Sequence, residues 1–192
     1  MSDSFQFSKS RWGILKDKKV FETPIFSLHE LSLEPENQDS THPFYILQAP
    51  EWINVIALTP ENKIILVEQY RAGIHETTLE IPGGMVDDGE TPLDAAGREL
   101  LEETGYTSSD WEFIGKTSSN PAILSNYTHL YLARNCKKVG EQQPDGSEDI
   151  KIHSPHISDF LELVKNGTVH HAIVLAAVSK FLLHTRAENF LE

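Results

Sequence analysis

The sequence has little that would link the protein to an oxidising compartment or to a membrane. Among its 192 residues there is a single cysteine, Cys136, so a framework of intramolecular disulfides is excluded and a reducing compartment is favoured. No apolar run approaches the roughly 18 residues that are needed to span a bilayer. The first residues also lack the basic start and apolar stretch of a signal peptide. Together these absences predict a cytoplasmic protein.

Positive charge is also scarce. The chain carries 29 acidic and 16 basic residues, which gives a formal net charge of −13. Such a surface repels the phosphate backbone, so nucleic acid is not an expected partner. A small phosphorylated substrate would meet the same repulsion unless bound cations screened it. The hydrophobic content of 39% and the charged content of 23% are otherwise ordinary for a globular domain.

The order of hydrophobic patterns favours an α+β or sandwich arrangement, because strand runs are mixed with a few helices and do not alternate regularly with them. No internal repeat or Ser/Gly-rich linker divides the chain. A turn at Thr59–Asn62 predicts that the strands on either side of it form a pair. Strands are expected at 20–21, 25–33, 52–58, 63–68, 76–81, 111–116, 127–133 and 149–153, and helices at 92–104, 158–165 and 170–184.

The helix at 92–104 has clear start and stop signals. Thr91 is a suitable N-cap, Pro92 fits the first helical position and Asp94 lies in the first turn. Gly105 is the expected C-terminal stop. At about 100° per residue, one stripe of this helix forms the predicted core face. That stripe consists of Leu93, Ala96, Gly97, Leu100 and Thr104.

Three glutamates lie together on the opposite side of this helix. Glu99, Glu102 and Glu103 have the i, i+3 and i+4 spacing that brings carboxylates within reach of one another. A solvated acidic face is the simplest interpretation. However, the helix dipole and mutual repulsion both disfavour carboxylates in the last turns of a helix. A bound hard cation such as Mg²⁺, which prefers oxygen ligands, would reverse both penalties.

The segment from Gly84 to Tyr106 resembles the Nudix box, a motif with many fixed positions. The match runs through Gly84, Glu90 and the stretch Arg98-Glu99-Leu100-Leu101-Glu102-Glu103-Thr104-Gly105, with Tyr106 as a mild substitution at the closing apolar position. The resemblance implies a loop–helix–loop catalytic element in a Nudix α/β/α sandwich with mixed sheets. It also implies Mg²⁺ as the cofactor, for which Mn²⁺ can substitute.

The same resemblance assigns roles to residues of the box. Glu99 and Glu103 correspond to the main metal ligands, and Glu102 to a further ligand or a carboxylate that positions water. The carbonyl of Gly83, just before the box, is similar to a backbone metal ligand. Arg98 is expected to contribute to catalysis by orienting the carboxylates, and Glu90 is expected to have a structural role.

The flanking residues resemble the branch that hydrolyses ADP-ribose and nucleotide sugars. The resemblance rests on Val67-Glu68-Gln69-Tyr70-Arg71, on Leu79-Glu80-Ile81-Pro82-Gly83-Gly84 and on Pro121. It implies that Arg71, Glu80 and Pro121 contribute to substrate binding. For Arg71, a surface arginine paired with a nearby acid is the alternative.

The segment 146–153 is similar to the loop of that branch that carries a catalytic glutamate, which makes Glu148 the candidate for the water-activating base or a further metal ligand. Related loops often have acidic residues two apart, but here the earlier position is Gly146. Asp145, Asp149 or Glu141 could therefore take this role, and Glu148 could be an ordinary loop acid.

The sequence does not identify the residues that would bind the nucleobase. Phe5, Trp12 and Trp52 could stack on a nucleobase, with core or interface packing as the alternative for each. A transition-metal site built from His153, His156, His170 and His171 is disfavoured, because oxygen-rich side chains surround them. Cys136 is expected to be a buried, unreactive side chain.

The resemblance implies hydrolysis of the diphosphate bond of ADP-ribose or another nucleoside-diphosphate sugar, giving a nucleoside monophosphate and a sugar phosphate. A nucleoside-triphosphate pyrophosphatase and a non-catalytic ADP-ribose sensor are the alternatives. It also implies two parts, an N-terminal β-rich segment at 1–50 for dimerisation and substrate binding and a hydrolase domain at 51–192. The expected assembly is an isologous homodimer.

Overall fold

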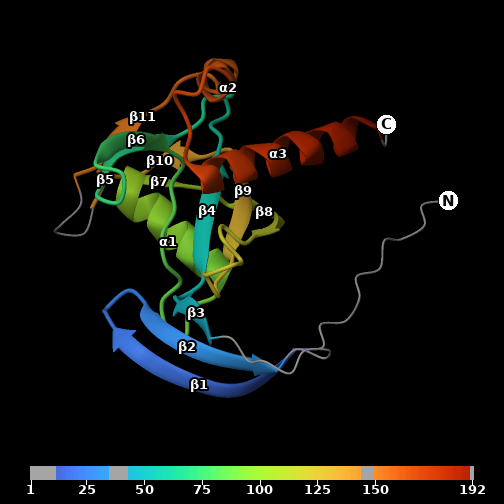
Figure 1. The fold of residues 1–192 in the computed structure, drawn as a ribbon. Helices are drawn as coiled ribbons and strands as arrows, with labels where there is room; N and C mark the ends of the chain where they lie inside the picture. Colours follow the sequence, from blue (N-terminus) through green and yellow to red (C-terminus); the bar gives the residue numbers. More distant parts are fainter. Residues whose placement is uncertain (1–11, 35–42, 144–148, 191–192) are drawn as a thin grey trace. The chain divides into compact units, whose positions relative to one another are not determined.

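The computed structural model describes residues 12–34, 43–143 and 149–190, and it divides into two compact units (Figure 1). The first unit comprises residues up to Ala49 together with Asn120–Ser125, and the second comprises Pro50–Ser119 and the chain from Asn126 onward. The described residues contain three helices and mixed sheets, so the predicted α+β class with an N-terminal β-rich part is confirmed. No helix of the described residues combines the length and apolar character needed to cross a membrane.

The first unit is an antiparallel sheet of three strands in the order β1-β2-β3. Its strands are β1 (Gly13–Glu22), β2 (Ser27–Glu34) and β3 (Pro43–Gln48). The sequence analysis predicted β1 only at its end and missed β3. Strand β1 is exposed along its whole length, so its weak hydrophobic alternation gave little signal. Trp12 meets the ring of Phe44 edge-on at 5.8 Å, and Phe5 lies outside the described residues.

The second unit contains two three-stranded sheets. One has the order β4-β9-β8, where β4 (Trp52–Ala57) runs parallel to β9 (Thr128–Arg134) and β8 (Asp110–Thr117) runs antiparallel to it. The other has the order β11-β5-β6 and is antiparallel. Its strands are β5 (Leu66–Arg71), β6 (Glu76–Glu80) and β11 (Lys151–His153). A short two-stranded ladder joins β7 (Tyr106–Thr107) to β10 (Lys137–Lys138).

The predicted pairing of the strands around Thr59–Asn62 holds only next to the turn and does not continue along β4 and β5. The turn itself is present, since the amide of Asn62 donates to the carbonyl of Thr59 at 3.0 Å. Beyond it, the two arms pair over a short stretch, through the bridge between Leu58 and Ile64 and the hydrogen bond from the Ile65 amide to the Ala57 carbonyl at 2.9 Å. Strand β5 pairs with β6 and β11 instead of β4 because it begins only at Leu66. The turn depends only on residues next to each other in the sequence. The pairing partners of β5 instead depend on how the strands pack in the folded domain.

Three helices complete the second unit. They are α1 (Pro92–Thr104), α2 (Ile157–Lys165) and α3 (Ala172–Phe190). Alternating residues of β4 show how they are layered, because successive side chains of a strand point to opposite faces. Val55 packs in a core cluster with Ala96 of α1, whereas Ile56 packs in a cluster with Val174 of α3. Helices α1 and α3 therefore cover opposite faces of the β4-β9-β8 sheet (Figure 1).

Candidate active site

Helix α1 has the bounds that its capping residues predict. The Thr91 hydroxyl accepts a hydrogen bond from the amide of Asp94 at 3.2 Å, and Pro92 occupies the first turn. At the other end, Gly105 has a φ of 73° and its amide donates to the carbonyl of Leu101 at 2.7 Å. This left-handed conformation favours glycine, so the helix ends here. The carboxylates of the last turns are thereby held in fixed positions.

The predicted core face of α1 requires correction. Leu93 is 43% exposed, whereas Ala95 is buried together with Ala96, Leu100 and Thr104. Glu103, predicted on the solvent side, is only 3% exposed. The reason is that part of the polar side of the helix is covered by the loop that follows β6, which the helical wheel cannot show.

Contact between Glu103 and this loop is direct. The amide of Gly83 donates to Glu103 Oε2 at 3.0 Å, which pairs the buried carboxylate with a backbone N–H. One turn earlier, the Glu99 carboxylate packs against the Cα atom of Gly84, and a side-chain carbon at Gly84 would collide with it. A larger residue at position 84 would therefore displace the Glu99 carboxylate from this position.

Strand β4 fixes the other side of the loop. The amides of Ile53 and Val55 donate to the carbonyls of Gly84 and Pro82, both at 2.9 Å. Between them, the side-chain amide of Asn54 donates to the carbonyl of Pro82 at 3.3 Å. Asn54 was not recognised from the sequence, although a polar residue inside an apolar strand was an available signal. The predicted backbone ligand, Gly83, therefore lies in a loop held by hydrogen bonds from one side and by helix α1 from the other.

Arg98 is the centre of the carboxylate cluster. Its Nε and Nη2 atoms donate to the two carboxylate oxygens of Glu90, each at 3.0 Å. Its Nη1 atom donates to Glu99 Oε1 at 2.9 Å and to Glu102 Oε2 at 3.1 Å. Nη2 also reaches the carbonyl of Met85 at 3.0 Å. One guanidinium thus orients three carboxylates and the loop, as its planar fork of donors permits.

These contacts change the acidities of the partners. The hydrogen bond from Arg98 lowers the pKa of Glu90 and keeps it ionised. The pKa of Arg98 is raised, above all by its hydrogen bond to Glu90. The guanidinium consequently keeps its charge at every physiological pH.

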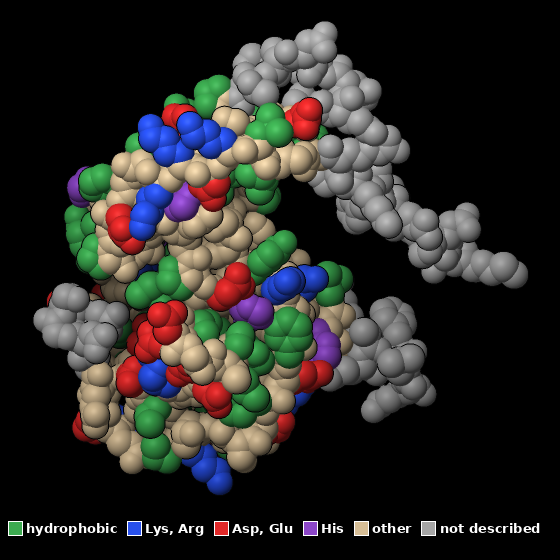
Figure 2. Space-filling view, turned by 90° about the horizontal axis from the view of Figure 1, so that it is seen from below, with side chains coloured by type: hydrophobic (Ala, Val, Ile, Leu, Met, Phe, Trp, Pro, Cys, Tyr) green, Lys and Arg blue, Asp and Glu red, His purple; other side chains and the backbone are tan. Residues whose placement is uncertain are grey.

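The donor set fits a hard divalent cation in chemistry. Glu99, Glu102 and Glu103 offer only carboxylate oxygens, the ligand type that Mg²⁺ prefers, and the Arg98 guanidinium donates to two of them. In the present arrangement Arg98 and the Gly83 amide engage these oxygens. Within the described part of the chain, no three His, Cys, Asp or Glu side chains converge as a ready metal cage. On the face drawn in Figure 2, acidic side chains form several groups with basic side chains between them. The net charge of −13 disfavours binding of an anionic substrate unless cations screen it.

Arg71 and Glu80, both predicted to bind substrate, contact each other. Arg71 Nε and Nη2 donate to the two oxygens of Glu80, each at 2.7 Å. Glu80 is 2% exposed and also accepts from the Thr78 hydroxyl at 2.5 Å, whereas Arg71 is 41% exposed. Burial would raise the pKa of Glu80, but the hydrogen bonds from Arg71 and Thr78 outweigh it and hold the pKa below its usual range. The structure thus shows Arg71 paired with a nearby acid, which was the alternative interpretation of this residue.

His171 adds a partner that the sequence did not reveal. Its Nε2 atom lies 3.9 Å from Glu80 Oε2, at the start of α3. Burial lowers the pKa of His171. Neither of these facts has a local signature, because the two residues are far apart in the sequence. The other histidines considered have separate contacts, with His153 on Glu68, His156 capping α2 and His170 facing Glu76.

The remaining predicted residues are the loop acids and Pro121. Glu148 and Asp145 lie outside the described residues, and Asp149 is exposed. Glu141 pairs with Lys138 at 3.3 Å. Pro121 is exposed and belongs to the first unit. The described start of the loop is nevertheless tied to α1, since the amide of Gln143 donates to the carbonyl of Glu102 at 2.7 Å.

Cys136 is buried, as predicted. Its thiol donates to the carbonyl of Ala133 at 3.4 Å, and burial raises its pKa to about 11. A thiol in this state is a poor nucleophile.

Comparison with known proteins agrees with this geometry. The model of the NUDIX domain matches residues 50–177. The chain is 31% identical over 166 residues to the methanol dehydrogenase activator of Bacillus methanolicus, covering 85% of this chain and 89% of that protein. It is 31% identical over 169 residues to the ADP-ribose pyrophosphatase of Bacillus subtilis, covering 85% and 91%. A crystal structure of an ADP compounds hydrolase superposes with a TM-score of 0.81 at 21% identity, over 95% of this chain and 98% of that one, which confirms the predicted sandwich fold.

Proposed function

Because this chain belongs to the NUDIX family, we propose that it is a Mg²⁺-dependent hydrolase of ADP-ribose or another nucleoside-diphosphate sugar. Water would add across the P–O–P bridge, so that one P–O bond forms and one breaks, giving a nucleoside monophosphate and a sugar phosphate. The relative named ADP-ribose pyrophosphatase supports this substrate class, because the similarity extends over 91% of that protein.

The contact that carries the proposal is the clamp between α1 and the glycine loop. Glu99 packs on Gly84 and Glu103 accepts from the Gly83 amide at 3.0 Å, which holds two carboxylates beside one short stretch of backbone. A bound Mg²⁺ would supply positive charge to the diphosphate oxygens and lower the pKa of a coordinated water. Glu99, Glu102, Glu103 and the Gly83 carbonyl would hold it.

The protein's own residues have distinct parts in this scheme. Arg98 orients Glu99 and Glu102, so that these carboxylates are already placed before substrate arrives. Glu102, 43% exposed, is the carboxylate of the three with the freest access to water, and we assign it a role in positioning the attacking water. Glu148 is proposed to accept the proton of that water. Arg71, held by Glu80, is proposed to contact a phosphate.

The assembly and location are further proposals. Strand β1 exposes large apolar side chains, among them Ile14 and Phe21. Exposed apolar surface of this kind is typical of an interface. It supports a homodimer formed through the N-terminal unit, and Pro121 of the same unit would then help to bind substrate. A cytoplasmic location stays a prediction from the sequence.

A substrate panel tests the proposed reaction. Purified protein with Mg²⁺ would be given ADP-ribose, nucleoside-diphosphate sugars and nucleoside triphosphates, and the products would be separated by chromatography. Cleavage of ADP-ribose or a nucleotide sugar to a monophosphate is expected. Turnover of triphosphates alone would favour the triphosphate pyrophosphatase, and binding of ADP-ribose without turnover would favour the sensor.

Two matched variants, Glu99→Gln and Glu162→Gln, distinguish the loss of a carboxylate in the proposed site from the loss of a glutamate charge elsewhere. Glu162 is an exposed glutamate on α2 that pairs with Lys165 at 3.1 Å. Only the change at position 99 should remove turnover. Equal activity of the two variants would contradict the proposed site.

A further inference from the structure

A pocket lies on the side of the β11-β5-β6 sheet that faces away from α1. Side chains on β5 show this, because Ile65, just before the strand, packs with Ala96 of α1, whereas Leu66 packs with Phe160 of α2. Residues alternate between the two faces of a strand, so Leu66 and Glu68 both point toward the α2 side. The pocket is therefore separated from the carboxylates of α1 by the sheet.

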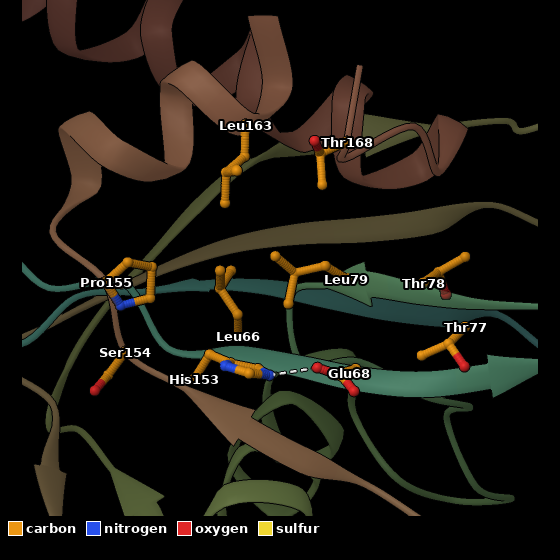
Figure 3. A pocket seen from close by; sticks show the side chains of 10 residues that line it. All are labelled: Leu66, Glu68, Thr77, Thr78, Leu79, His153, Ser154, Pro155, Leu163 and Thr168. Carbon is orange, nitrogen blue, oxygen red and sulfur yellow. Dashed lines mark hydrogen bonds and ion pairs between the residues drawn. The ribbon is translucent and has the colours of Figure 1, made fainter. Parts of the chain in front are cut away.

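This pocket has a volume of about 440 Å³, within the range of about 300–1,000 Å³ that is typical of small-molecule sites. Figure 3 shows Leu66 and Leu79 on the sheet, with Leu163 of α2 pointing toward them from the opposite side. A slot with apolar side chains on both sides suits a flat ring. Its described lining consists of Leu66, Glu68, Thr77, Thr78, Leu79, His153, Ser154, Pro155, Leu163 and Thr168.

The polar end of the pocket is formed by Glu68 and His153. Glu68 Oε2 and His153 Nε2 are 2.6 Å apart, and both side chains are partly exposed (Figure 3). Lys151 lies outside the lining with its Nζ atom 3.8 Å from Glu68 Oε2. The described lining contains one carboxylate and neither lysine nor arginine, so it offers no strong site for a phosphate. A carboxylate oxygen at the edge of an apolar slot instead favours a ligand that donates N–H groups.

We propose that this pocket binds an uncharged heteroaromatic amine, the chemical class to which nucleobases and nucleosides belong. The ring lies between Leu79 and Leu163, and its amino group donates to Glu68. Thr77 and Thr168 supply hydroxyls for the sugar or ring substituents. The site is separate from the proposed diphosphate site and does not depend on hydrolytic activity.

Adenosine is the probe, and purine riboside, which has hydrogen in place of the exocyclic amine and no ring N–H, is its matched control. Binding to the full chain would be followed by chemical-shift changes of backbone amides. With adenosine at millimolar concentration, we expect changes at Glu68, Thr77, His153 and Thr168. We expect purine riboside to bind about tenfold more weakly, because it loses a hydrogen bond to a charged acceptor.

Three variants locate the site. Glu68→Gln should weaken adenosine binding about tenfold or more, whereas Glu61→Gln, at an exposed turn residue, should leave it unchanged. Leu163→Trp should fill the slot and abolish binding while hydrolysis continues. If circular dichroism shows that Leu163→Trp does not fold, Thr168→Trp at the exposed rim replaces it.

The proposal is overturned if adenosine gives no shifts, if the shifts map to α1 and the 81–84 loop, or if the tryptophan variant still binds. It is also overturned if purine riboside binds as tightly as adenosine, or if Glu68→Gln leaves binding intact. Failure of the hydrolase proposal would leave these results unaffected, because binding at Glu68 is measured without substrate turnover.

Discussion

The amide of Gly83 donates a hydrogen bond to Glu103 Oε2 at 3.0 Å, joining the loop after β6 to the last turn of α1. Glu103 is 3% exposed, so this bond gives a buried carboxylate a backbone N–H donor. Residue 103 therefore has two roles, as a proposed metal ligand and as a structural link. The two roles can be separated by experiment.

Replacing Glu103 should affect stability as well as turnover. Glu103→Gln keeps an acceptor for the Gly83 amide and should lower kcat at least about 100-fold with a small change in the free energy of unfolding. Glu103→Ala leaves the buried amide unpaired and should cost about 1–3 kcal/mol in addition. Urea unfolding and steady-state kinetics measure the two effects, with Glu162→Ala as the exposed control. Equal stability of the Gln and Ala variants would show that the Gly83 bond contributes nothing.

Glycine substitutions test the close approach of Glu99 to the loop. Gly84→Ala should displace the Glu99 carboxylate and lower kcat at least about tenfold, because the new side-chain carbon would collide with it. The matched control is Gly97→Ala on α1, where a side-chain carbon meets nothing within 4 Å outside the helix's own backbone. That change should stabilise the protein by about 0.5–1 kcal/mol, since alanine is the better helix former. If Gly84→Ala retains full kcat, Glu99 does not need its position against the loop.

The fork of Arg98 should not be replaceable by a simple positive charge. Arg98→Lys retains the charge but loses the paired hydrogen bonds to Glu90, so kcat should fall about 10–100-fold. Arg134→Lys is the control, because Arg134 also pairs with a carboxylate, that of Glu112 at 2.8 Å, outside the site. A lysine variant with the kinetics of the parent protein would rule out an orienting role for the guanidinium.

The Arg71–Glu80 pair should make stability depend on pH in the acid range. The lowered pKa of Glu80 means that its ionised form is favoured in the folded state. This stability is fully present above the unfolded pKa of about 4.3 and is lost as pH falls through the lower folded value. Unfolding midpoints of the parent protein and of Glu80→Gln should therefore differ near pH 7 and converge toward acid pH. A difference that stays constant between pH 7 and pH 3 would show that ionisation of Glu80 is not the cause.

The effect of Mg²⁺ on stability should depend on Glu99 and not on the overall negative charge of the protein. Mg²⁺ should raise the melting temperature of the parent protein, because a ligand that binds the folded state stabilises it. The rise should disappear in Glu99→Gln and persist in Glu162→Gln, and chelation with EDTA should stop turnover of the parent. A melting temperature that responds to Mg²⁺ equally in both variants would place the cation elsewhere.

The chain encodes helix α1 almost completely in local signals. Thr91, Pro92 and Gly105 set its ends, and the spacing of Glu99, Glu102 and Glu103 places them on neighbouring turns of the helix. These features depend on residues within one or two helical turns of each other. The resemblance to the Nudix box could be recognised from the sequence because this motif is also a continuous stretch of residues.

Only the tertiary structure decided which of these carboxylates is buried and what it contacts. Glu103 is covered because the loop at Gly83 packs on it, and Arg71 meets Glu80 because β5 pairs with β6. The separation of β4 and β5 into different sheets likewise depended on strand partners distant in the sequence. Hydrophobic period and capping residues report the conformation of one element, whereas strand pairing and burial are set by the packing of several elements together.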